Sequence, residues 1–179
     1  MLEPVCTIDT SCIVALDHLD LLPKLSLLFS RVLLPKAVRT ELFKRRSTKD
    51  RLRTLLRSYA FIARCDEYDK GTVDVLLIER VKQGMEDRGE TEAVVQAAGL
   101  GATVIVDDPG GRELAERNRL DYHGSLWVMK RLWELELLSG PSLREGLLRL
   151  RRQGIRLPWL SANALLAECG QAPLTDSDR

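Results

Sequence analysis

Short apolar runs alternate with longer amphipathic stretches along the chain. The apolar runs are rich in β-branched residues and bounded by turn residues, which predicts buried strands. They cover residues 4–8, 31–35, 59–65 and 102–108, with a shorter candidate at 120–124. In the stretches between them, apolar residues recur three or four positions apart, as on one face of a helix. These stretches cover residues 10–16, 20–29, 37–46, 48–58, 73–84, 89–101, 112–120 and 125–138.

This alternation predicts the fold class α/β, as a three-layer α/β/α sandwich with a mainly parallel central sheet. Two further helices, expected at residues 142–154 and 160–170, follow Gly140 without another strand. We therefore expect a domain over residues 1–140 and a C-terminal helical appendage over residues 141–179. The appendage is expected either to pack on the core or to bind a partner.

Composition and charge narrow the class of protein. With 179 residues, 45% of them hydrophobic and 30% charged, the chain has the values of an ordinary globular protein. Its net charge of +1 gives no global field toward nucleic acid or membranes. We expect no secretory leader, and the longest uncharged apolar stretch, residues 93–106, is too short to span a bilayer. We expect a cytoplasmic protein without membrane contact.

Acidic residues follow two of the predicted strands. Asp9 comes directly after the first strand, and Asp107 and Asp108 end the strand that begins at residue 102. Ligands of parallel α/β sheets bind outside the carboxyl ends of the strands, so these carboxylates share one site if the two strands are neighbours. Each also has a purely structural interpretation, because Asp9 can cap the next helix and the pair can form a turn before Pro109.

Three glutamates extend this pattern. Glu41 lies in the helix after the second strand, and Glu90 and Glu92 open the helix before the strand at residue 102. Glu41 is also spaced to pair with Arg45, and the other two suit the dipole at a helix start. Glu90 and Glu92 are two positions apart and point in different directions, so at most one is expected to be a direct ligand. These alternatives do not explain why the acids gather at one end of the strands.

Crowded carboxylates repel one another unless a hard cation neutralises them. Mg²⁺ or Mn²⁺ prefers oxygen ligands, usually a few carboxylates together with waters and a substrate phosphate. Such a site activates a water molecule and stabilises the leaving oxygen of a phosphodiester. The acids therefore indicate metal-dependent phosphodiester hydrolysis.

The same segments resemble the PIN-domain ribonucleases. IDTSCIVAL is similar to the family's first strand with its aspartate and hydroxyl residue, and LLFSRVLLPKAVRTEL to its second strand, proline and glutamate helix. DRGETEAVVQAAGLGATVIVDDPGGRELAERNRL is similar to its acid-led helix and acid-ended strand. The resemblance covers roughly residues 1–140 and is closest to a prokaryotic subfamily near the VapC-type toxins. It implies an endoribonuclease that depends on Mg²⁺ or Mn²⁺, with the toxin of a toxin–antitoxin pair as one role that the resemblance suggests.

Carried over by position, the resemblance implies catalytic roles for the acids at the family's motif positions: Asp9, Glu41, Glu92 and Asp108. Glu92 is preferred over Glu90 because Ala93 and Ala97 follow it in the family's helix pattern. The family's usual aspartate at this position is a glutamate here, which bears on the metal geometry.

The resemblance also implies how these residues are used. The metal ligands would be Asp9, Glu92 and Asp108, directly or through water. Glu41 would hold a second ion or orient the attacking water, Asp107 is an alternative to Asp108, and Ser11 matches a small hydroxyl residue near the family's site. A homodimer and a cognate antitoxin are the implied protein partners.

Basic residues are concentrated in one segment. Between Lys36 and Arg64, ten Lys or Arg residues stand against two acids. This segment is expected either to guide an RNA backbone or to be a solvated helical face. The candidate RNA-binding residues are Arg39, Lys44, Arg45 and Arg46. A second basic run, residues 149–152, lies in the appendage, where Trp159 beside Pro158 is freer to be exposed than the other tryptophans.

Two other functions compete with the nuclease. A HAD-like phosphatase also uses an aspartate after its first strand, but it requires an acid two positions later, where this chain has Ser11. A non-catalytic RNA-binding or regulatory protein with the PIN fold would bind RNA without cutting it. Acids at all the family's motif positions favour the enzyme over this second alternative.

Overall fold

The structure, a computed structural model, describes residues 3–44, 54, 57–66, 69–82 and 88–175. Its strands are β1 (Glu3–Ile8), β2 (Phe29–Leu34), β3 (Ile62–Arg64), β4 (Thr103–Ile105) and β5 (Tyr122–His123). Its helices are the 3₁₀ helix η1 (Leu22–Leu27) and the α-helices α1 (Thr10–His18), α2 (Lys36–Lys44), α4 (Lys70–Lys82), α5 (Arg88–Leu100), α6 (Pro109–Arg117), α7 (Ser125–Glu134), α8 (Gly140–Arg152) and α9 (Trp159–Glu168).

The strands form one parallel sheet in the order β3-β2-β1-β4-β5. β1 is central because Cys6 pairs with Val32 of β2 on one side and with Thr103 of β4 on the other. Cys6 and Ile8 are fully buried, as expected for a strand that is covered on both faces of a parallel sheet. The predicted α/β fold with a parallel central sheet is confirmed.

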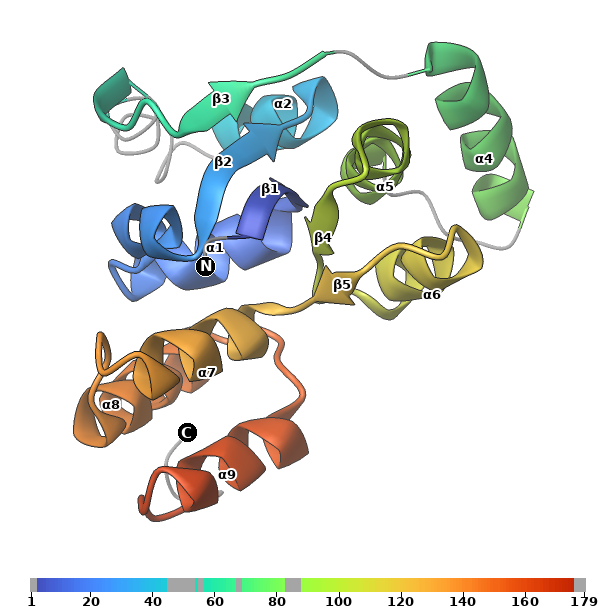
Figure 1. Cartoon of the computed structure of the whole chain (residues 1–179). Coiled ribbons are helices and arrows are strands. Elements are labelled where there is room, and N and C mark those ends of the chain that lie inside the picture. The colour runs from blue at the N-terminus through green and yellow to red at the C-terminus, as the bar shows by residue number, and fades with distance from the viewer. Residues whose placement is uncertain (1–2, 45–53, 55–56, 67–68, 83–87, 176–179) are drawn as a thin grey trace.

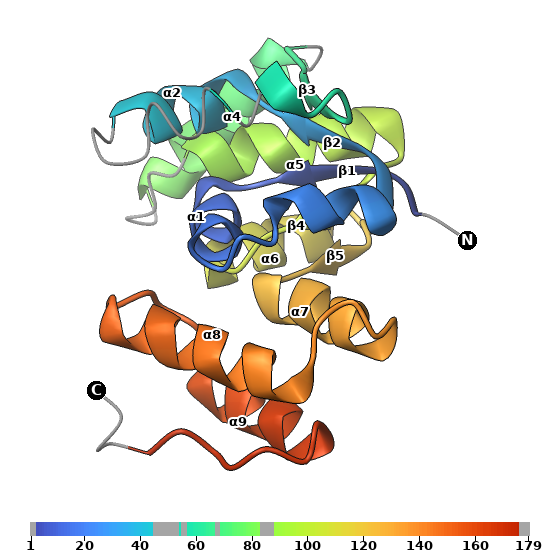
Figure 2. The same cartoon turned by 90° about the vertical axis from the view of Figure 1, so that its left-hand side faces the viewer.

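Helices cover both faces of the sheet (Figures 1 and 2). α1 and α7 lie on one face, and α5 and α6 lie on the other, with α4 on the outside of α5. The side chains of β4 alternate between these layers, as strand geometry requires. Ile105 belongs to the core beneath α1 and α7, whereas Val104 and Val106 pack with α5 and α6.

The C-terminal helices share the first of these two cores. Leu143 and Leu147 of α8 and Leu166 of α9 are buried in the same cluster as Leu16 of α1. α8 approaches closely, because a Cβ atom at Gly146 would lie 3.0 Å from the Leu19 side chain. α8 and α9 therefore add a layer outside α1 and α7 and are held there by apolar packing (Figure 2).

Several elements differ in detail from those expected. The amphipathic stretch at residues 20–29 is only a short 3₁₀ helix, since Pro23 lies in its first turn and β2 already begins at Phe29. Most of the helix predicted at residues 48–58 lies outside the described residues. Among the helices that the structure describes, none has the length and hydrophobicity needed to cross a membrane.

Candidate active site

The carboxyl ends of β1 and β4 meet at one edge of the sheet. Ile8 and Ile105 are register partners, and the Asp9 backbone N–H donates to the Ile105 carbonyl at 3.0 Å. Asp9 on one strand end therefore lies beside Asp107 and Asp108 on the other. The expectation that these acids lie together required their two strands to be neighbours, and β1 and β4 are neighbours in the sheet.

Asp9 is both a helix cap and a buried acid. It is the N-cap of α1, where its Oδ1 accepts the Cys12 N–H at 2.8 Å and its Oδ2 accepts the Ser11 hydroxyl at 2.6 Å. Only 2% of the residue is exposed. Burial raises the pKa of the Asp9 carboxyl to about 6, the bonds from Ser11 and Cys12 oppose that rise, and the Asp107 charge adds to it. The hydrogen bonds that Asp9 accepts as a helix cap therefore do not fully offset the cost of burying its charged carboxylate.

Asp107 and Asp108 are held differently. The Asp107 carboxylate accepts the Ser125 N–H at 3.0 Å and hydroxyl at 2.5 Å, and pairs with Arg112 at 3.3 Å. Asp108 is exposed and caps α6 by accepting the Gly110 N–H at 2.8 Å. Asp107 is therefore a fixed charge, while Asp108 is the more accessible of the two.

Glu41 approaches the same region from α2. Its Oε2 accepts the Thr10 hydroxyl at 2.5 Å, which ties the α2 acid to the start of α1. A Cβ atom at Gly89 would lie 2.8 Å from Glu41 Oε1, so the carboxylate rests directly against the backbone of α5. A larger residue at position 89 would displace the Glu41 carboxylate from this position.

Glu90 and Glu92 of α5 have different surroundings. Glu90 pairs with Arg80 of α4 at 2.9 Å, with both side chains buried. Glu92 accepts the Ala37 N–H at the start of α2 at 2.7 Å and the Arg88 Nε–H at 2.8 Å. Glu92 is thus a buried tie between α5 and α2, and it does not line the pocket described next, whereas Glu90 does.

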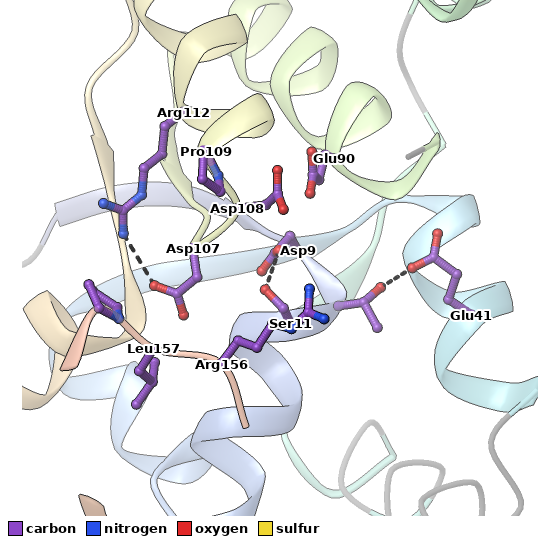
Figure 3. Close-up of a pocket in the computed structure, with 12 residues that line it drawn as sticks. Asp9, Ser11, Glu41, Glu90, Asp107, Asp108, Pro109, Arg112, Arg156 and Leu157 are labelled. Carbon is purple, nitrogen blue, oxygen red and sulfur yellow. Dashed lines mark hydrogen bonds and ion pairs between the residues drawn. The ribbon is translucent and has the colours of Figure 1, made fainter. Parts of the chain in front are cut away.

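A pocket of about 700 Å³ brings these acids together (Figure 3). Its lining residues are Asp9, Thr10, Ser11, Glu41, Glu90, Asp107, Asp108, Pro109, Arg112, Arg156, Leu157 and Pro158. The acids come from the ends of β1 and β4 and from α2 and α5. The remaining wall is formed by residues 156–158, which connect α8 to α9.

Comparison of the chain with models of known protein families gives a match over most of its length. The family model DUF3368, described as a PIN domain, matches residues 5–171. The chain belongs to the PIN-domain family. The matched segment of this PIN domain includes α8 and α9, so the family's unit contains the connection that closes the pocket. Membership also supports a nuclease as the coarse class of activity.

Solved structures similar to this PIN domain have low sequence identity. PAE2754 from Pyrobaculum aerophilum is 17% identical, with a TM-score of 0.48 over 74% of this chain and 98% of its own. VapBC2 from Rickettsia felis, bound to a promoter DNA fragment, is 15% identical with a TM-score of 0.47 (67% and 98% covered). VapBC-1 from nontypeable Haemophilus influenzae is 16% identical with a TM-score of 0.47 (68% and 98%). No curated protein matches the chain.

The candidate RNA-binding residues of α2 do not line the pocket. Arg39 Nη2 contacts both oxygens of Asp66, at 2.8 and 3.0 Å, and its Nη1 donates to the Leu34 carbonyl, so it is engaged locally. Lys44 is exposed at the end of α2. Arg45 and Arg46 lie outside the described residues. RNA binding by this segment stays a prediction.

Three arginines at the site were not singled out by the sequence. Arg80 reaches Glu90 from a helix ten positions earlier, and no short-range spacing indicates this contact. Arg112 follows the Asp107-Asp108 pair by about one helical turn, a spacing that was readable from the sequence. Arg156 lies far along the chain and reaches the acids only because α8 packs on α1.

The raised pKa of Asp9 predicts a pH-dependent stability for the metal-free PIN domain. The folded pKa of about 6 exceeds the ordinary 3.8, so the folded state favours the neutral carboxyl. Its contribution to stability is complete below the ordinary pKa and is lost as pH rises through 6, by about 3 kcal/mol in all. Urea midpoints with EDTA should therefore favour Asp9→Asn over wild type increasingly from about pH 4 to pH 6, and the difference should level off above about pH 7. A difference that is constant across this range would contradict the prediction.

Proposed function

We propose that this protein is a metal-dependent endoribonuclease that hydrolyses RNA phosphodiester bonds. One observation carries the proposal: five carboxylates from separate parts of the chain line a single pocket at the carboxyl ends of β1 and β4. Among the lining residues, the basic side chains are the arginines Arg112 and Arg156. This excess of negative charge repels a phosphodiester unless a cation is also bound.

The residues at the pocket have donor atoms and positions that suit a hard divalent cation. Every candidate donor is a carboxylate or hydroxyl oxygen, the type that Mg²⁺ and Mn²⁺ prefer. Burial and the neighbouring Asp107 raise the pKa of Asp9, a cost that a bound cation relieves. Within the described part of the chain, however, no three His, Cys, Asp or Glu side chains form a ready-made metal cluster.

We propose that Asp9, Glu90 and Asp108 hold the metal. Glu90 replaces the expected Glu92 in this assignment, because the Glu92 carboxylate is bonded to Ala37 and Arg88 away from the pocket. A bound Mg²⁺ or Mn²⁺ would supply an activated water and stabilise the leaving oxygen.

The chain's own residues then have separate tasks. Ser11 and the Cys12 N–H hold the Asp9 carboxylate in one orientation. Glu41, fixed by Thr10, orients the attacking water and accepts a hydrogen bond from it. Asp107 is fixed by Ser125 and Arg112 and keeps the local potential negative, which favours cation binding.

Removal of the metal tests this function directly. The purified protein is expected to cut a mixed pool of single-stranded RNA with Mn²⁺ or Mg²⁺ and to lose that activity in EDTA. Restoring the metal should restore cutting, because chelation leaves the chain intact. The cut ends can be read by sequencing, and unchanged cutting in EDTA would contradict metal dependence.

The resemblance to VapC-type toxins extends the proposal to protein partners. We propose a homodimer and a cognate antitoxin that covers the carboxylate pocket. Light scattering measures the mass of the purified protein, and a monomeric mass at micromolar concentration would refute the homodimer.

The antitoxin is tested by adding the product of the neighbouring gene. Loss of RNA cutting on this addition would support an antitoxin that covers the pocket.

A further inference from the structure

Arg156 lies at the junction of two pockets. It lines the carboxylate pocket together with Leu157 and Pro158. It also lines an adjacent pocket of about 330 Å³ between the end of α8 and the start of α9. Figure 3 shows the Arg156 side chain extending from the α8–α9 connection into the carboxylate pocket on the side of Ser11.

The connection that carries Arg156 is anchored on both sides. The Ile155 N–H donates to the Leu150 carbonyl at 3.0 Å, and Gly154 supplies the positive φ of 69° that ends α8. Leu157 is buried in the core, and Pro158 is the N-cap residue of α9. Arg156 is therefore presented from a fixed turn, although its own side chain is exposed.

The charges at the pocket leave Arg156 available for a substrate. Arg112 is already paired with Asp107 at 3.3 Å and donates through Nε to the Val106 carbonyl. Among the residues that the structure describes, Arg156 forms neither an ion pair nor a hydrogen bond. A guanidinium matches the geometry of a phosphate group and holds it by charge-assisted hydrogen bonds.

The adjacent pocket combines positive charge with an aromatic ring. It is lined by Arg151, Arg152, Gly154, Ile155, Arg156 and Trp159. The Arg151 guanidinium carbon lies 5.5 Å from the Trp159 ring centroid, which places a flat cation over the ring. Bases of single-stranded nucleic acids stack on aromatic rings and on guanidinium planes, and their phosphates bind arginines.

We propose that this α8–α9 surface binds the RNA strand beside the bond that is cut. Arg156 binds the phosphate group that enters the carboxylate pocket, and the Arg151–Trp159 pair receives the base of the adjoining nucleotide. Because Arg156 lines both pockets, one strand can occupy them in succession. This inference rests on the proposed nuclease function and assigns its substrate a path across the C-terminal helices.

A purely structural role for Arg156 makes a different prediction. If the guanidinium only offsets the negative charge of the acids, its removal should alter stability or metal affinity. It should then leave the salt dependence of RNA binding unchanged. A phosphate contact instead contributes counterion release, which the salt dependence measures.

Binding and cleavage by the full chain test the proposal. A short fluorescein-labelled single-stranded RNA of mixed sequence is titrated by anisotropy over a series of salt concentrations, with a fixed concentration of Ca²⁺, an oxygen-binding cation, in place of Mn²⁺. Arg156→Gln is expected to weaken binding about tenfold. It should also lower the slope of log affinity against log salt by about 0.7. Arg156→Lys should keep the slope, because it keeps the charge.

Arg31→Gln is the matched control. Arg31 is an exposed arginine in the amino-terminal half of β2, where it pairs with Val5 of β1, and it does not line the pocket at the carboxyl ends of the strands. Its removal takes the same charge from the protein, so it should leave affinity, slope and cleavage rate unchanged. A loss equal to that of Arg156→Gln would mean that only net charge matters and would overturn the proposal.

Trp159 tests the base contact separately. Trp159→Leu is expected to weaken RNA binding roughly 5- to 150-fold, the range for loss of one base–aromatic stack. Trp159→Phe should retain most of the affinity, since it keeps an aromatic face. Equal binding by the Leu and Phe variants, with both folded by circular dichroism, would overturn the base contact.

Cleavage with Mn²⁺ separates failure of this inference from failure of the proposed function. Wild type that neither binds nor cuts RNA would overturn both. Wild type that cuts RNA, with Arg156→Gln equal to it in affinity, salt slope and cutting rate, would overturn this inference alone.

Discussion

Asp9→Asn is expected to slow RNA cutting by more than about 100-fold, because it removes a proposed metal ligand, and changes to outer-shell partners alone cost roughly 10- to 100-fold. Asn keeps the size of Asp and an oxygen that accepts the Cys12 N–H, so α1 retains its cap. The substitution removes the negative charge that is proposed to hold the cation. The rate is measured under single-turnover conditions with Mn²⁺, together with the melting temperature.

Glu92→Gln is the matched control for this substitution. Glu92 is a buried carboxylate near the same edge of the sheet, but it is bonded to Ala37 and Arg88. Gln keeps an acceptor for the Ala37 N–H, so most of the cutting activity should remain. Full activity in Asp9→Asn, or equal losses in the two variants, would contradict the site as assigned.

Arg80→Met is expected to destabilise the protein by about 3–5 kcal/mol, the usual cost of leaving one partner of a buried ion pair alone. Arg80 pairs with Glu90 at 2.9 Å and also donates to the Gly110 carbonyl at 3.0 Å. It thereby joins α4, α5 and the start of α6 behind the pocket. Thermal unfolding in EDTA should show a drop of roughly 6–20 °C.

A double variant tests whether the uncompensated charge of Glu90 causes the lower stability of Arg80→Met. Adding Glu90→Gln to Arg80→Met removes the uncompensated charge and should recover much of the stability. Arg117→Gln breaks an exposed pair with Glu113 on α6 and should change the melting temperature little. If Arg80→Met unfolds at the same temperature as Arg117→Gln, the buried pair does not stabilise the fold.

The fold was largely predictable because its strands are short apolar runs with little ambiguity. Asp9 and Asp108 follow such runs directly, and the parallel pairing of β1 with β4 brings them together, as the α/β pattern implied. The 3₁₀ helix at Leu22–Leu27 was harder to predict. Its leucines have helical spacing, but Pro23 and the start of β2 leave no room for a full α-helix.

The site was less predictable, because helix rotation and long-range packing determine it. Glu90 and Glu92 differ by two positions, and only the packing of α5 against α2 and α4 decides which carboxylate lines the pocket. Periodicity alone cannot supply that rotation. Arg156 needed the contact between α8 and α1, which joins residues distant in sequence and has no local signal.

The shared core of α1, α8 and α9 also has a consequence for how the protein is made. On the ribosome, Asp9 and Ser11 emerge early, but Leu143, Leu147 and Leu166, which share a buried cluster with Leu16, are translated much later. Residues 156–158, which close the pocket, also come late. We therefore expect the nascent chain to remain without a complete pocket until residues 143–166 have left the ribosome, which would delay the proposed cutting of RNA until then.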